Sequence, residues 1–374
     1  MLKIRNYSLT YLFLLFMPFV GILAHRLDVL VAYVPIVLFL TLFVFFKSQK
    51  GQITNFQFLY ALLLIISLYC SFVYQNIYYE NSNLYFVQFF GSNILFFLVF
   101  SFFVNIKRLD DLFFIKISIF IVLLIFLFVL LDYIFIKFGL NHLQLMYKPD
   151  AHSYSGKPMG LFGQFSINST YSVFFYLVYL GFKKNNYSSI KNLLLFLVVT
   201  ATIILQNSGS GFLAYILLLC AIFYKFRLFR FFIAPIGFMA IILIVQQNII
   251  QKLSYDYLLY LYEYFLRFLQ EYISSIKNPF DFLFGNGVET IDFGPFFIIG
   301  NVGFLFFILY SFMLFYLILI VKNKYLRISI IVLMVSNLHY PALFYPLMNV
   351  FLPLMVLYIC FHERTKIHKE VVGF

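Results

Sequence analysis

The chain has 374 residues, of which 64% are hydrophobic and 11% are charged, whereas an ordinary soluble domain has about 25% charged residues. Such a chain lacks the polar surface to cover a water-soluble globule, which excludes a soluble protein and indicates one embedded in lipid. The apolar residues form long runs without the two-residue alternation of outer-membrane strands. We therefore expect an all-α polytopic membrane protein and exclude a barrel.

The apolar runs predict twelve membrane-spanning helices at about 20 residues each. We read the N-terminal run as a retained helix, because no small-residue cleavage site follows it. The runs at 192–206 and 211–224 are short, so a re-entrant pair there is an alternative. The predicted helices lie near 7–24, 29–46, 56–75, 84–104, 112–138, 163–182, 192–206, 211–224, 231–245, 296–321, 328–345 and 346–361.

Positive charge predicts the orientation of these helices. The net charge of +12 comes mainly from Lys and Arg clusters in every second connection between the apolar runs. Such connections stay in the cytoplasm, so we predict that both termini are cytoplasmic. Because topology explains the basic residues, no nucleic-acid partner is expected. The prediction is a single integral membrane domain over 1–374, with larger external loops at 139–162 and 246–295.

The cytoplasmic connections are too short for a nucleotide-binding domain, and no G-x-x-x-x-G-K-[ST] phosphate-binding loop occurs. The histidines and cysteines do not have metal-ligand spacing, so neither a cofactor nor a metal is expected. Function tends to lie on loops that a rigid scaffold holds, so we expect the chemistry in the two external loops. The first of these mixes Tyr, His, Lys, Asp and Ser with Gly and Pro, a composition that suits either a polyhydroxyl ligand or a solvated turn.

The second external loop contains a predicted amphipathic helix over 254–272. Glu263, Arg267 and Glu271 recur every four residues and share a face with Tyr260 and Tyr264. Leucines and phenylalanines supply apolar surface, so the helix is expected to lie at the outer membrane interface. Its charges have two interpretations, an exposed ladder of ion pairs or a fixed guanidinium that binds phosphate.

Three further candidates lie near external helix ends. Glu289 and Asp292 follow a Gly-Asn-Gly turn, and a helix cap is the plain alternative for Asp292. His339 lies in a polar interruption of the last apolar hairpin. Since the ordinary pKa of histidine is near neutrality, His339 is a candidate proton acceptor or phosphate ligand, or else a satisfied loop residue.

Three stretches carry a family resemblance. The first joins a basic residue to a glycine, an apolar pair and an asparagine in Lys157-Pro-Met-Gly160-Leu-Phe-Gly163-Gln-Phe-Ser-Ile-Asn168. The second is a Ser/Gly-rich step between two helices, Gln206-Asn-Ser208-Gly209-Ser210-Gly211. The third runs from Asn278-Pro-Phe280 through Phe284-Gly285-Asn-Gly287 to Asp292 and Gly300-Asn-Val-Gly303. With these motifs the chain resembles the Wzy-type O-antigen and capsular polysaccharide polymerases, which are related to the O-antigen ligases.

The resemblance implies glycosyl transfer on the outer face of the bacterial inner membrane, between two polyprenyl-diphosphate-linked oligosaccharide repeat units. A sugar hydroxyl of one unit attacks the anomeric carbon of the other, and the lipid diphosphate leaves. That reaction needs cations at the diphosphate and a base near the hydroxyl. Arg267 and Lys157 fit the first need, and His339, Glu263 or Glu289 fits the second.

The resemblance also implies the partners, which are membrane lipid, the lipid-linked saccharide and a chain-length regulator protein. The family often has Arg where this chain has Lys157, and lysine keeps the charge without the bidentate fork. Two alternatives are a flippase or exporter for the same saccharide and an O-antigen ligase. Polar residues concentrate outside the bilayer, which favours an enzyme over a transporter. The expected substrate contacts are Lys157, Asn168, Tyr260, Tyr264, Glu289 and Asp292.

Overall fold

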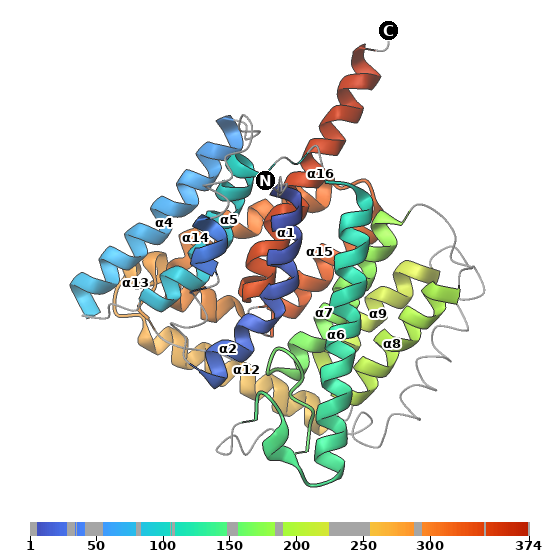
Figure 1. Cartoon of the computed structure of the whole chain (residues 1–374). Helices are drawn as coiled ribbons and strands as arrows, with labels where there is room; N and C mark the ends of the chain where they lie inside the picture. The colour runs from blue at the N-terminus through green and yellow to red at the C-terminus, as the bar shows by residue number, and fades with distance from the viewer. Residues whose placement is uncertain are drawn as a thin grey trace.

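A computed structural model of the chain describes residues 6–27, 34, 36–41, 55–79, 84–104, 106, 109–147, 156–183, 190–223, 255–287, 294–339 and 342–372. Within these ranges the regular elements are helices, and no strand occurs (Figure 1). The elements are α1 (Asn6–Phe16), η1 (Met17–Phe19), α2 (Val20–Arg26), α4 (Asn55–Tyr79), α5 (Leu84–Phe103), α6 (Asp111–Lys137), η3 (Asn141–Leu143), α7 (Phe165–Phe182), α8 (Ile190–Gln206), α9 (Gly209–Phe223), α12 (Tyr255–Ser275), α13 (Pro279–Phe284), α14 (Gly294–Ile320), α15 (Lys324–Asn337), η6 (Ala342–Phe344) and α16 (Pro346–Val372).

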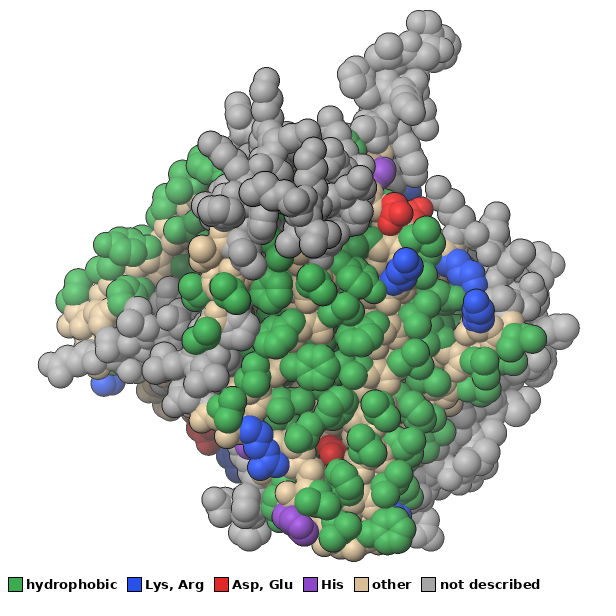
Figure 2. All heavy atoms as spheres, in the orientation of Figure 1, with side chains coloured by type: hydrophobic (Ala, Val, Ile, Leu, Met, Phe, Trp, Pro, Cys, Tyr) green, Lys and Arg blue, Asp and Glu red, His purple; other side chains and the backbone are tan. Residues whose placement is uncertain are grey.

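Within the described ranges, four helical stretches are long and apolar enough to cross a membrane, namely Leu9–Arg26, Gln57–Tyr79, Asp111–Lys137 and Gly294–Ile320. Shorter apolar helices are Phe90–Phe102, Ile190–Gln206, Gly209–Phe223 and Pro346–His362. On the face in Figure 2, hydrophobic side chains cover the middle of the bundle and charged side chains gather toward its two ends. These features are those of a membrane-embedded protein, because lipid favours an apolar belt between two polar ends.

Helix α7 is the centre of one half of the bundle. All of its side chains from Ser166 to Leu180 are buried, including several hydroxyl and amide groups. Helices α6, α8, α9 and α15 pack around α7, and α4, α5, α13, α14 and α16 form the other half (Figure 1). A helix buried on every side needs hydrogen-bond partners for its polar groups, and the side chains of Asn168, Thr170 and Tyr179 have them.

Polar side chains start several helices. The carboxylate of Asp110 accepts a hydrogen bond from the amide of Phe113 at 2.8 Å, and so caps α6. Asp111 in the first turn and Lys137 in the last complement the helix dipole. Asn323 caps α15 through the amides of Tyr325 and Leu326. These caps satisfy backbone groups at helix ends that have no partner within the helix.

The structure corrects three predicted helices. The first, 7–24, is interrupted by the short helix η1 at Pro18, because proline has no N–H for the helical ladder. The last-but-one, 328–345, ends at Asn337. The helix predicted over 296–321 is interrupted at Gly303, whose φ of 82° and ψ of 162° are not helical. The predicted helix 231–245 and most of 29–46 lie outside the described residues.

Candidate functional site

Four chain segments meet at one end of the bundle, which we call the loop end. There α6 ends, α7 begins, α8 meets α9, and α15 ends. Hydrogen bonds join these segments to one another and to the start of α14. The hydroxyls of Thr170 and Ser336 lie 2.8 Å apart, and the amide of Gly294, the first residue of α14, donates to the carbonyl of Leu338 at 3.3 Å. The three stretches that carry the family resemblance all reach the loop end or the helices that border it.

Asn168 holds the loop that precedes α7. Its Nδ2 donates to the carbonyl oxygens of Met159 at 2.8 Å and Gln164 at 2.7 Å, and its Oδ1 accepts from the amide of Phe162 at 3.2 Å. The loop passes so close that a Cβ on Gly160 would lie 2.6 Å from Asn168 Nδ2, and Gly160 also has a φ of +65°. The buried Asn168 therefore fixes the loop from inside. The direct contact between Asn168 and substrate that we expect from the sequence stays a prediction.

Two further side chains reach this loop from neighbouring helices. Asp132 of α6 is only 3% exposed, and its Oδ2 accepts from the amide of Gly160 at 2.6 Å. Gln206, at the end of α8, donates from Nε2 to the carbonyl of Pro158 at 3.1 Å. Neither residue was among the predicted site residues, although Gln206 begins the second stretch that carries the family resemblance. The sequence did contain an indication for Asp132, because it is a carboxylate inside an apolar run. Burying a carboxylate in the membrane costs free energy unless the group has a partner.

Arg26 holds the other described part of the first external loop. At the end of α2, its Nε donates to the carbonyl of Leu145 at 2.6 Å and its Nη2 to the carbonyl of Gln144 at 2.5 Å. Residues 148–155 of this loop lie outside the described part. Hydrogen bonds therefore connect both described ends of the loop to helices.

Lys157 is half-buried and lies at the start of α7. Its Nζ is 4.6 Å from the ring centroid of Phe165, the first residue of α7. Among the described residues, no carboxylate lies within ion-pair distance of this ammonium group. Burial lowers the pKa of Lys157. Gln164, at the N-cap position of α7, makes no side-chain cap, so the positive end of the helix dipole lies beside the lysine. Together, the Lys157 ammonium group and the N-terminus of α7 favour the binding of an anionic group.

The Ser/Gly step brings a second helix N-terminus to the same place. Ser208 Oγ donates to Ser166 Oγ at 3.1 Å and accepts from the amide of Gly211 at 3.3 Å. A Cβ on Gly211 would lie 2.4 Å from Ser169 Cβ, so glycine allows α9 to approach α7 closely. The N-termini of α7 and α9 are thus adjacent. Two stretches that are distant in sequence, 157–168 and 206–211, form one polar cluster, which we call the Lys157 cluster.

The helix predicted over 254–272 is present as α12. Arg267 and Glu271 are exposed, with side chains 61% and 56% accessible, and Arg267 Nε lies 3.8 Å from Glu271 Oε1. Glu263, one turn earlier, is also exposed. The opposite side of α12 packs on α14, where the ring of Tyr272 stacks on that of Phe296 at 5.3 Å. The guanidinium of Arg267 is therefore presented to the surroundings of the bundle.

The other predicted site residues have different outcomes. His339 is exposed just after α15, and its amide donates to the carbonyl of Ser336 at 3.1 Å, so it lies at the loop end. Glu289 and Asp292 lie outside the described residues, as do the side chains of Tyr260 and Tyr264. Among the described residues, no group of three His, Cys, Asp or Glu side chains is arranged to hold a metal ion.

A hydrogen-bond network around Asp281 anchors the far end of α12. Asp281 Oδ1 accepts from the hydroxyls of Tyr79 at 2.5 Å and Tyr74 at 2.8 Å. Its Oδ2 accepts from the amides of Lys277 at 2.7 Å and Asn278 at 3.0 Å. Burial by itself would raise the pKa of Asp281, but these four hydrogen bonds lower that pKa below its ordinary value. The charged carboxylate is therefore the form that the fold stabilises.

Asp281→Asn should lower the stability of the protein, because the neutral amide has one acceptor oxygen where the carboxylate has two, so two of the four donors lose their acceptor. Each orphaned donor costs about 1–3 kcal/mol. A lowered carboxyl pKa contributes stability above the ordinary pKa and loses it as the pH falls through the lowered value. The gap in melting temperature between wild type and Asp281→Asn should therefore narrow in acid. Thermal unfolding in detergent from pH 7 to pH 3 measures this gap, with exposed Glu271→Gln as the control. A gap that stays constant would contradict the assignment.

No protein-family model, no curated protein and no solved structure matches this chain.

Proposed function

We propose that this protein polymerises polyprenyl-diphosphate-linked oligosaccharide repeat units into a surface polysaccharide, an O-antigen or a capsule. The observation that carries the proposal is the Lys157 cluster. There a half-buried ammonium group, with no described carboxylate within ion-pair distance, lies beside the start of α7, against which the start of α9 packs. Lysine and helix N-termini both favour phosphate groups. The family resemblance of 157–168 and 206–211 supports the same substrate, since both stretches belong to this cluster.

The proposed topology puts this cluster on the outer face of the bacterial inner membrane. Twelve membrane-spanning helices with both termini in the cytoplasm would place the loop end outside, with 139–162 and 246–295 as the larger external loops. That orientation rests on the distribution of Lys and Arg. A donor activated by its lipid diphosphate needs no nucleotide.

In the proposed reaction, the terminal sugar hydroxyl of the acceptor unit forms a new bond to the anomeric carbon of the donor unit. The bond from that carbon to the diphosphate oxygen breaks, and the lipid diphosphate leaves with the electron pair. Lys157 and Arg267 stabilise the charge that develops on the diphosphate. His339 or Glu263 takes the hydroxyl proton. Asn168, Asp132 and Gln206 position the loop that carries Lys157.

Arg267→Ala should abolish long polysaccharide chains while the protein still inserts into the membrane, because the variant lacks the exposed guanidinium. The matched control is Glu271→Ala, which removes the ion pair but keeps the cation. An exposed pair of this kind contributes only about 0.3–0.5 kcal/mol, so chain lengths should stay near normal in the control. Gel analysis of surface polysaccharide in a deletion strain, complemented with each variant, measures the outcome. Wild-type chain lengths with Arg267→Ala would remove Arg267 from the site.

The uncomplemented deletion strain distinguishes the proposed function from its two alternatives. A single repeat unit that is still exported and attached indicates a polymerase. Full-length polymer that accumulates on its lipid carrier would indicate a ligase. Repeat units trapped on the cytoplasmic face would indicate a flippase. The last two outcomes contradict the proposal.

A further inference from the structure

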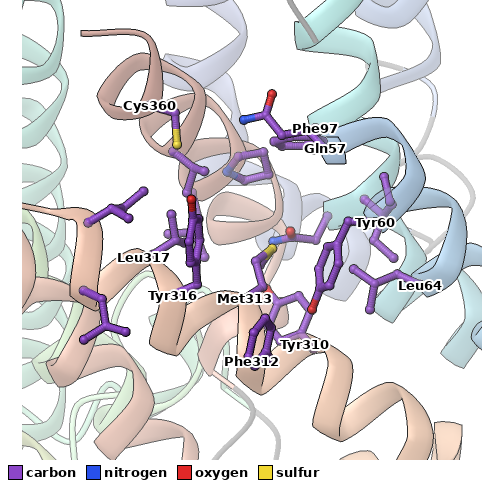
Figure 3. Close-up of a pocket in the computed structure, with 18 of the residues that line it drawn as sticks. Gln57, Tyr60, Leu64, Phe97, Tyr310, Phe312, Met313, Tyr316, Leu317 and Cys360 are labelled. Carbon is purple, nitrogen blue, oxygen red and sulfur yellow. The ribbon is translucent and has the colours of Figure 1, made fainter. Parts of the chain in front are cut away.

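A cavity of about 490 Å³ lies between α4, α5, α14 and α16. None of the proposed site residues lines it. Figure 3 shows Tyr60 and Tyr310 at one end of the cavity and Gln57 and Cys360 at the other. The lining is mainly aliphatic and aromatic, and the volume is within the range of about 300–1,000 Å³ that is typical of small-molecule sites.

Two buried donors in the wall of this cavity have no acceptor in the part of the chain that the structure describes. Asn93 is 4% exposed and Tyr310 is 3% exposed. No hydrogen-bond partner lies within reach of Asn93 Nδ2 or the Tyr310 hydroxyl among the described residues. The neighbouring Tyr60 differs, because its hydroxyl donates to the carbonyl of Leu309. A buried donor without an acceptor destabilises the protein. A ligand that supplies acceptor oxygens to these donors would therefore gain binding free energy.

The position of the two donors limits the class of ligand. Tyr310 precedes the end of α14 at Ile320 by ten residues, which is about 15 Å along a helix and half of a hydrocarbon core of about 30 Å. Asn93 is likewise in the middle of α5. The ester carbonyls of phospholipids lie near the headgroups, so they do not reach this depth. The acceptor oxygens must therefore belong to a part of the ligand that reaches the middle of the apolar core, while Lys322, just beyond the end of α14, lines the opposite end of the cavity.

The rim of the cavity shows where such a molecule enters. Phe312, Tyr316 and Leu319 line the cavity and are 61%, 47% and 79% exposed. They belong to α14, one of the helices apolar enough to cross a membrane. The cavity is therefore accessible from the side of the bundle that faces lipid, and not only from water.

We propose that this cavity binds a neutral isoprenoid quinone. The carbonyl oxygens of its ring accept hydrogen bonds from Asn93 Nδ2 and from the Tyr310 hydroxyl, and its isoprenoid chain contacts the aliphatic lining. The aromatic side chains Phe97 and Phe312 supply surfaces on which a flat ring can pack. This quinone site is independent of the proposed polymerase function and involves no electron transfer.

The test uses the purified full-length protein in detergent, with menaquinone-4 as the probe. Menaquinone-4 should raise the melting temperature with a saturable concentration dependence. Squalene, an isoprenoid chain without carbonyl oxygens, should not. No shift with menaquinone-4, or an equal shift with squalene, would overturn the proposal, because the cavity would then be either closed or a simple hydrocarbon groove.

Tyr310→Phe and Asn93→Leu should each weaken menaquinone-4 binding by about 3- to 10-fold, the effect of one neutral hydrogen bond. The same changes should leave the ligand-free melting temperature equal to or above that of wild type, because each removes an unpaired buried donor. Tyr133→Phe on α6 is the matched control outside the cavity and should not change binding. A lower ligand-free melting temperature for Tyr310→Phe would indicate that the hydroxyl already has a hydrogen-bond partner within the protein. That result would overturn the assignment of this donor.

Discussion

Lys157→Ala should reduce polymer formation by about 100-fold or more, as expected when a preorganised group that stabilises developing charge is removed. Lys157→Arg should keep part of the activity, because it restores the charge with a different shape. The matched control is Lys137→Ala. Lys137 is an exposed lysine at the end of α6, with Nζ 5.4 Å from the ring of Tyr133, so it shares the residue type and the aromatic neighbour. Its removal should have little effect.

The pH dependence provides a second test of Lys157. Burial lowers the pKa of Lys157, so the free protein loses this positive charge at a lower pH than a solvated lysine would. The alkaline decline of kcat/KM should therefore begin earlier in wild type than in Lys157→Arg, whose guanidinium stays charged. Turnover of a purified lipid-linked repeat unit in detergent measures both profiles. Identical alkaline limbs, or equal loss of activity in the alanine and arginine variants, would exclude a role for this charge.

Gly303→Ala should prevent normal folding of the second half of the bundle. A Cβ at this position would lie 2.1 Å from the carbonyl oxygen of Leu283 and 2.6 Å from its carbonyl carbon. The backbone φ of 82° and ψ of 162° are in a region that essentially only glycine adopts, which costs other residues about 1–3 kcal/mol. The steric overlap adds about 1–3 kcal/mol. The sum is a large part of a typical folding stability of about 5–15 kcal/mol.

Gly209→Ala is the control for this change. Gly209 begins α9, has no atom within 4 Å of the added Cβ, and alanine is the better helix former. Size-exclusion chromatography and thermal unfolding in detergent should show a large loss of folded protein for Gly303→Ala and none for Gly209→Ala. If Gly303→Ala melts like wild type, α14 is continuous at this position and the packing of α13 against it is different.

The close contact between Gly303 of α14 and the backbone of Leu283 also explains the position of α13. The amides of Asn286 and Gly287 both donate to the carbonyl of Gly300, at 3.0 and 2.9 Å. Asn286 Nδ2 donates to the carbonyl of Ser275 at 3.0 Å, which connects the end of α12 to this turn. The missing side chain at Gly303 leaves room for the backbone of Leu283 and Phe284 at the end of α13. The turn, α13 and the end of α12 therefore form one unit with α14.

Local composition was sufficient to predict the membrane class and most of the helices. Long apolar runs predict helices in lipid wherever their neighbours are polar, and the structure has α6 over Asp111–Lys137 where 112–138 was expected. The amphipathic pattern over 254–272 likewise predicts α12. Both predictions depend only on residues close in sequence. The Gly303 interruption was not predicted, because a glycine in an apolar run gives no sign that another backbone segment passes beside it.

The arrangement of the candidate site was decided by tertiary structure alone. In a lipid-embedded chain almost every face of a helix is apolar, so the sequence does not indicate which helix is central or which helices are neighbours. That is why the central position of α7, the hydrogen bond from Gly160 to Asp132 and the contact between Ser166 and Ser208 were not predicted. The sequence by itself determined the class of protein and the residue types available at the loop end. Long-range packing decided that the start of α9 lies against the start of α7 and that Gln206 reaches the loop carrying Lys157, because only the folded bundle brings 157–168 and 206–211 together.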